Sequence, residues 1–269
     1  MALRAGNLAA LFLLVSYLLA SCTSTPGSGQ RTQLTVFAAA SLAESMQALA
    51  DDFEDQNPGV DVALNLASSY QLVQQLTAGA QADVFASANP QQMEVAVENG
   101  LVREGEHQVF ANNRLVVVTP PGNPGEVKDL ADLAKPGLRL VLAAQEVPAG
   151  RYAQEFLQRA SGDGSLGSDY AERVLRNVVS YEQSVRFVLT KVVLGEAGAG
   201  IVYATDADSP DGQSLGVIEI PEPLNPRAAY VIAPVAGAHQ SDLARAFIDF
   251  VLSPEGQGIL RAYGFQPVH

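Results

Sequence analysis

From residue 33 onward, short apolar runs alternate with segments of helical spacing, and this alternation most limits the folds open to the chain. The runs 35–40 and 60–66 have the length and apolar content of buried strands. Between them, apolar residues from Leu42 to Phe53 recur at three- and four-residue intervals, which is typical of a helix packed on a sheet. The sequence therefore predicts an α/β fold in which mixed sheets are flanked by helices.

The same reading extends to the C-terminus. Further strands are predicted at 82–86, 114–119, 138–143, 177–180, 200–204 and 228–234, and helices at 72–76, 152–160, 170–175, 185–194, 243–252 and from Pro254. We expect two lobes: residues 33–113 plus 235–269 form the first, residues 114–227 form the second, and 228–234 is the return hinge strand. A discontinuous lobe joined by two extended crossings is the layout of proteins that close around a ligand.

The N-terminus has the pattern of an export signal. Residues 1–21 combine Arg4 with an apolar run over 8–20 that is too short to span a bilayer comfortably. The motif Leu19-Ala20-Ser21-Cys22 matches the bacterial lipoprotein signal, in which Cys22 becomes the lipid-bearing first residue, and 22–32 is predicted to be a flexible tether. We expect an extracytoplasmic protein that meets the membrane only through this lipid anchor. The alternative is an ordinary secretory signal with an incidental cysteine.

Composition and motifs exclude several functions. The chain has 29 acidic and 16 basic residues, a net charge of −13, and no cluster of Lys or Arg, which argues against nucleic-acid binding. A single cysteine and three scattered histidines do not suggest a metal centre. The segment 162–167 matches a dinucleotide-binding glycine pattern, but it follows a helix rather than a strand. We expect neither an enzyme nor a bound cofactor.

Four predicted strands open into helices through small or hydroxyl-bearing residues. They do so around Ser41, at Ser68-Ser69, at Ala149-Gly150 and at Ser184-Val185. Because a helix N-terminus carries unpaired N–H groups and a partial positive charge, several that converge can hold an anion without Lys or Arg. Each alone is an ordinary helix cap, but two in each predicted lobe favour a shared cleft.

Several segments, in order and with compatible spacing, resemble the periplasmic molybdate-binding proteins of ABC importers. They are Leu34–Leu42, Ala67–Ser69, Gly79–Ala88, Val147–Tyr152, Gly200–Ala207 and Tyr263–Phe265. The resemblance implies a two-lobed periplasmic-binding-protein fold of type II. It also implies an oxyanion site at Ser41, Ser69, Ala149, Val185 and Tyr203.

That implied site offers hydroxyl and backbone N–H donors and no acceptor, which suits a fully deprotonated tetrahedral dianion such as molybdate or tungstate. The molybdenum of the bound anion would be the metal of the site. Phosphate near neutral pH keeps a proton that would find no acceptor, at a cost of about 1–3 kcal/mol. Sulfate, another dianion, remains an alternative, and an enzyme on the same scaffold is a more distant one.

The resemblance further implies delivery of the anion to a membrane permease with a cytoplasmic ATPase, by a protein that we expect to be a monomer. Three residues beside the implied ligands have open roles. Arg151 and Arg186 are expected to be surface arginines that contribute long-range attraction, and Tyr70 is expected to pack rather than to line the cleft.

Overall fold

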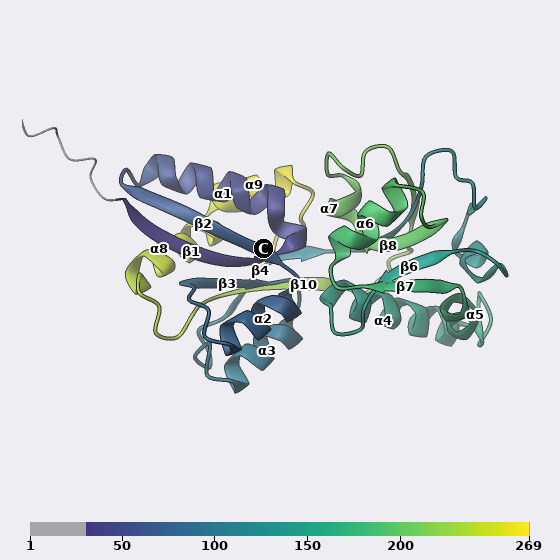
Figure 1. The fold of residues 1–269 in the computed structure, drawn as a ribbon, viewed down its shortest axis with the longest axis horizontal. Helices are drawn as coiled ribbons and strands as arrows, with labels where there is room; N and C mark the ends of the chain where they lie inside the picture. The colour runs from purple at the N-terminus through teal and green to yellow at the C-terminus, as the bar shows by residue number, and fades with distance from the viewer. Residues whose placement is uncertain (1–30, 269) are drawn as a thin grey trace, which may run out of the picture. The chain divides into compact units, whose positions relative to one another are not determined.

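The computed structural model describes residues 31–268. The signal segment 1–21, Cys22 and the tether up to residue 30 lie outside these residues. The described chain forms two five-stranded mixed sheets with helices on both faces of each (Figure 1). This architecture confirms the predicted α/β, two-lobed fold. Within 31–268, none of the helices has the length and apolar content needed to cross a membrane.

The first sheet has the strand order β2-β1-β3-β10-β4. Its strands are β1 (Thr32–Ala39), β2 (Val60–Ala67), β3 (Val84–Ser87), β4 (Gln108–Asn113) and β10 (Ala228–Pro234). Strand β1 lies parallel to β2 and β3, whereas β10 runs antiparallel to β3 and β4. The carboxyl ends of β1, β2 and β3 therefore meet at one edge, where ligands bind in open α/β sheets.

Helices cover both faces of this sheet because its central strands are apolar on both sides. Figure 1 shows α1 and α9 over one face and α2 and α3 over the other. The helices of this lobe are α1 (Ala43–Gln56), α2 (Ser69–Thr77), α3 (Pro90–Glu98), α8 (Ser241–Leu252) and α9 (Pro254–Ala262), with a 3₁₀ turn at Ala40–Leu42. Phe53 of α1 packs edge-on against Phe247 of α8, with ring centroids 5.2 Å apart.

The second sheet has the order β7-β6-β8-β5-β9. Its strands are β5 (Leu115–Thr119), β6 (Leu140–Ala143), β7 (Val178–Glu182), β8 (Ala199–Tyr203) and β9 (Gly216–Glu219). It repeats the plan of the first sheet, since β6 is parallel to β7 and β8 while β5 is antiparallel to β8 and β9. Its helices are α4 (Pro148–Asp163), α5 (Tyr170–Arg176), α6 (Val185–Val193) and α7 (Ala204–Ala207), with a 3₁₀ turn at Leu130–Ala134.

The chain passes between the sheets twice. It leaves the first sheet after β4, at Asn113, and enters the second at Leu115 of β5. It returns between β9 and β10, and β10 pairs within the first sheet along its whole length. The segment 228–234 is thus a sheet strand in this structure, and its role as a hinge stays a prediction.

Helix α4 begins four residues before the predicted start, at Pro148, because proline suits the first helical position. This places Gly150 in the first turn, directly over the end of β6. A Cβ at Gly150 would collide with the carbonyl oxygens of Ala143 and Ala144. Glycine at this position therefore allows the helix start to approach the strand end.

Gly150 and Gly162 both lie in α4 but have different surroundings, so replacing each with alanine should have opposite effects on stability. Gly150→Ala should lower the free energy of unfolding by about 1–3 kcal/mol, because the added methyl overpacks against backbone. Gly162→Ala, whose Cβ meets nothing within 4 Å, should raise it by about 0.4–1 kcal/mol through reduced chain entropy. Urea unfolding of the two variants measures both. Equal effects would contradict the close approach of α4 to β6.

Candidate functional site

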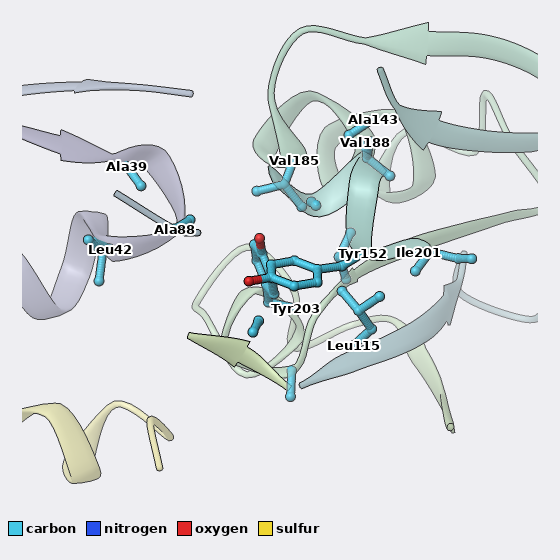
Figure 2. Packing of buried hydrophobic residues seen from close by; sticks show 14 of the residues in the cluster. Ala39, Leu42, Ala88, Leu115, Ala143, Tyr152, Val185, Val188, Ile201 and Tyr203 are labelled. Carbon is cyan, nitrogen blue, oxygen red and sulfur yellow. The ribbon is translucent and has the colours of Figure 1, made fainter. Parts of the chain in front are cut away.

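One pocket is formed where strand ends of both sheets meet helix starts. The space between its lining atoms, open solvent included, is about 210 Å³, so the pocket suits a small ion rather than a drug-sized ligand. Figure 2 shows Ala39 and Ala88 on the side of the first sheet and Val185 and Tyr203 on the side of the second. The lining residues are Ala39, Ala40, Ser41, Ser68, Ser69, Ala88, Val147, Pro148, Ala149, Ser184, Val185 and Tyr203.

The structure brings all five residues of the predicted oxyanion site into this pocket. Each is at most 4% exposed, so a bound group would be almost wholly removed from water, where electrostatic interactions are stronger. Among residues 31–268, no Asp, Glu, Lys, Arg or His lines the pocket. The five residues are Ser41, Ser69, Ala149, Val185 and Tyr203.

Backbone N–H groups supply the first kind of donor. Ser69 and Val185 are the first residues of α2 and α6, and Ala149 is the second residue of α4. N–H groups in a first helical turn have no acceptor within the helix. The capping side chains of Ser68 and Ser184 accept the N–H groups of Gln71 and Arg186, respectively. The N–H groups that lie in the pocket therefore remain available.

The two serine hydroxyls are held so that they can donate. Ser69 Oγ accepts the N–H of Ala88 at 2.9 Å, which leaves the Ser69 proton for another acceptor. Ser41 Oγ lies 2.9 Å from the hydroxyl of Tyr230, which is itself 3.5 Å from the amide nitrogen of Asn113. Donation from Asn113 to Tyr230, and from Tyr230 to Ser41, would leave the Ser41 proton free in the same way.

Tyr203 contributes the remaining hydroxyl. Within residues 31–268 this buried oxygen has no hydrogen-bond partner, which is costly unless a ligand accepts its proton. Burial raises the pKa of Tyr203 well above its usual range, so the phenol stays neutral and can donate. Tyr152 and Tyr230 pack against its ring, with centroids 6.5 Å and 5.7 Å away, and they restrict its orientation.

A carboxylate lies close to the pocket but faces away from it. One oxygen of the fully buried Asp206 accepts the N–H of Tyr203 at 3.2 Å, and the other lies 3.0 Å from Nε of Arg186. Burial raises the pKa of Asp206 to about 7, although Arg186 and the Tyr203 N–H act to lower it. Burial disfavours the charged form of Arg186, but Asp206 and Glu44 together raise its pKa. Both charges are thus engaged outside the pocket.

One prediction for a residue beside the site needs correction. Arg186 is not a free surface arginine: its side chain is 18% exposed and is paired with Glu44 and Asp206. Tyr70 does not line the pocket, as expected, and it is 37% exposed. Arg151 is exposed, as expected.

Sequence reasoning missed Tyr230 and Ala88, which orient the two serines. Tyr230 lies in a strand that the sequence predicted and Ala88 lies just after one. Their position near the carboxyl edge of the sheet could have indicated that they lie close to the serines.

Among the described residues, no three His, Cys, Asp or Glu side chains are grouped as ligands for a metal ion.

Comparison with known proteins identifies relatives across most of the chain. Residues 34–266 match the family of bacterial extracellular solute-binding proteins. The chain is 38% identical to the molybdate-binding protein ModA of Mycobacterium tuberculosis over 246 residues, which are 91% of this chain and 88% of the relative.

Solved structures agree on the fold. The periplasmic molybdate-binding protein of Azotobacter vinelandii superposes with a TM-score of 0.73 at 22% identity, covering 88% of this chain and all of that one. The sulfate-binding protein SubI of Mycobacterium tuberculosis gives a TM-score of 0.80 at 21% identity, covering 88% of each chain. With its sequence, its two lobes and its enclosed pocket, the chain belongs to the bacterial extracellular solute-binding proteins and is a relative of ModA.

Proposed function

We propose that this protein is an extracytoplasmic receptor that binds molybdate, or tungstate, at Ser41, Ser69, Ala149, Val185 and Tyr203. The observation that carries the proposal is a buried pocket lined by hydrogen-bond donors and by no charged side chain. The similarity to ModA supports molybdate as the anion. SubI, a sulfate-binding protein of the same fold, makes sulfate the second candidate.

The donors balance the charge of a dianion without a counter-ion. Ser41 and Ser69 would each give a hydroxyl and an N–H, Ala149 and Val185 an N–H, and Tyr203 its phenol. Hydrogen bonds to a charged group contribute about 1.5–3 kcal/mol each. The partial positive charge at the helix starts adds to this attraction. Local dipoles, rather than the net charge of −13, therefore decide whether an anion binds.

The same donors disfavour a protonated anion. Hydrogen phosphate carries a proton that needs an acceptor, and the pocket has no carboxylate to supply one. Molybdate, tungstate and sulfate have no such proton. Size separates sulfate from the two larger oxyanions. We also infer binding rather than catalysis, because the pocket's one titratable side chain, Tyr203, has a pKa raised far above neutral.

Isothermal titration with four anions tests the proposal. Molybdate and tungstate should bind most tightly, sulfate more weakly, and phosphate at least about tenfold more weakly than sulfate, which corresponds to the cost of about 1–3 kcal/mol for its unpaired proton. No heat with any of the four would refute an oxyanion site. Tighter binding of sulfate than of molybdate would instead favour the second candidate.

Removal of single donors tests the residue assignment. Tyr203→Phe and Ser41→Ala should each weaken molybdate binding by about 10–100-fold, since each deletes one hydrogen bond to a charged ligand. Tyr230→Phe should weaken it less, because it removes only the group that orients Ser41. The dissociation constant of each variant is measured by the same titration.

The chain provides matched controls for these substitutions. Tyr181→Phe alters an exposed tyrosine of the second lobe, and Ser45→Ala removes a buried hydroxyl that bonds the carbonyl of Leu42. Neither residue lines the pocket, so both should leave affinity within about twofold. Unchanged affinity in both Tyr203→Phe and Ser41→Ala would refute the assignment.

We further propose that the two lobes, 33–113 plus 235–269 and 114–227, close on the anion about 228–234, and that the monomeric protein delivers it to an ABC permease with a cytoplasmic ATPase. The relatives support a transport role. The lipoprotein motif ending at Cys22 supports a lipid anchor at the outer side of the cytoplasmic membrane.

Cys22→Ser tests the anchor. Cells that express the wild type should retain the protein in the membrane fraction and label it with radioactive palmitate, because a lipid on Cys22 would hold it there. The variant should lose the label and appear in the soluble extracytoplasmic fraction. Label or membrane retention that is unchanged in the variant would contradict the lipoprotein interpretation. Molybdate affinity of the purified variant serves as a control and should not change.

A further inference from the structure

Arg186 does not line the pocket, yet it follows Val185 directly and pairs with carboxylates of both lobes. Its Nη1 lies 2.9 Å from Oε1 of Glu44, and its Nη2 contacts the other oxygen of that carboxylate. Its Nε lies 3.0 Å from Asp206. Of the ion pairs formed by the described residues, only Arg186–Glu44 joins a helix of the first sheet to one of the second.

Each of the two carboxylates is tied to a segment that carries a predicted donor. Glu44 lies in the first turn of α1, three residues after Ser41. Asp206 accepts the N–H of Tyr203. Arg186 itself is the second residue of α6, next to Val185. One guanidinium thus connects the segments of three of the five predicted ligands.

The geometry points to Arg186 as a positioning residue that, with Glu44, clasps the two lobes over the bound oxyanion and slows its release without touching it. This inference rests on the proposed function for the identity of the ligand.

The energetic basis is that the clasp exists only when the lobes are together. Arg186 in α6 and Asp206 in α7 both lie in the second lobe, whereas Glu44 in α1 lies in the first. A contact made in only one conformation shifts the equilibrium toward that conformation. A forked, two-bond pair between a guanidinium and a carboxylate is strong and directional. Asp206 is completely buried and lies 3.0 Å from Arg186 within the same lobe, so this ion pair does not depend on Glu44.

Other polar contacts also join the two lobes, and they are formed by neutral groups. At the crossing between the sheets, Asn113 Nδ2 donates to the buried Thr205 Oγ1 at 2.8 Å. Two further contacts lie beside the pocket. Gln71 Nε2 donates to Gln183 Oε1 at 3.2 Å, and Gln92 Nε2 donates to the carbonyl of Glu146 at 3.4 Å. Both involve neutral, exposed side-chain amides. The Arg186–Glu44 pair is charged and partly buried, with side chains 18% and 31% exposed, so we expect it to dominate closure.

Stopped-flow kinetics of molybdate binding test the clasp. The chain has eight tyrosines and no tryptophan, so tyrosine fluorescence reports on the pocket. Glu44→Gln and Arg186→Gln should each raise koff about tenfold with little change in kon, as loss of one partner of a desolvated charge pair does. The double variant should be no worse than the worse single variant, because both changes remove the same contact. Arg186→Lys should fall between wild type and Arg186→Gln.

Controls separate a clasp from general destabilisation. Glu106→Gln and Arg245→Gln remove an exposed ion pair within the first lobe and should leave koff unchanged. If Arg186→Gln fails to fold, Glu44→Gln still tests the clasp, since it leaves Arg186 paired with Asp206. An unchanged koff, additive effects in the double variant, or a lower Tm with wild-type kinetics would overturn the inference.

Small-angle scattering of the ligand-free protein separates failure of the clasp from failure of the proposed function. Glu44→Gln should increase the radius of gyration relative to wild type, because the open form becomes more populated. This readout does not depend on which anion binds. If wild type bound none of the four anions, the proposed function would fail while the clasp would still be judged by scattering. Identical radii of gyration for wild type and Glu44→Gln would overturn the inference that this ion pair holds the lobes together.

Discussion

Hydrogen-bond donors gathered in one buried pocket are the feature on which the rest of this structure depends. An unpaired polar group in the interior costs free energy, so proteins keep such groups few. Here several are gathered at one point, where α2, α4 and α6 begin and where Tyr203 ends β8. A bound group that accepts their protons would recover this cost. The two sheets and their helices hold these donors close together and keep them away from solvent.

The surrounding polar contacts keep the site free of acceptors. Ser69 already accepts the Ala88 N–H, and Ser41 contacts the hydroxyl of Tyr230. The carboxylate of Asp206 is occupied by the Tyr203 N–H and by Arg186, and Glu44 is paired with the same arginine. Acceptor atoms of these neighbours are thus used within the protein. Under the proposed function, selectivity against a protonated anion depends as much on these neighbours as on the lining residues.

The repeated sheet plan explains how the donors converge. In each sheet three parallel strands end at one edge, and the fourth strand, β10 or β5, is antiparallel. Parallel strands place their carboxyl ends, and the helix starts that follow, at the same edge. Two such edges that face one pocket supply donors from both sides, and Arg186–Glu44 adds a charged contact across it.

The sequence by itself determined the element order, because strong apolar periodicity and helix caps are local signals. Strand β10 occupies the predicted 228–234, and the five residues that the resemblance implied as ligands line one pocket. Short elements without such signals were missed. Strand β4 ends in buried Asn112 and Asn113, whose side-chain partners Pro267 and Thr205 lie 155 and 92 residues away in the sequence. Strand β9 is a largely exposed edge strand of four residues. Only the tertiary structure decided the roles of Tyr230, Arg186 and Asp206, because a side chain's partner across the fold leaves no periodic trace in the sequence.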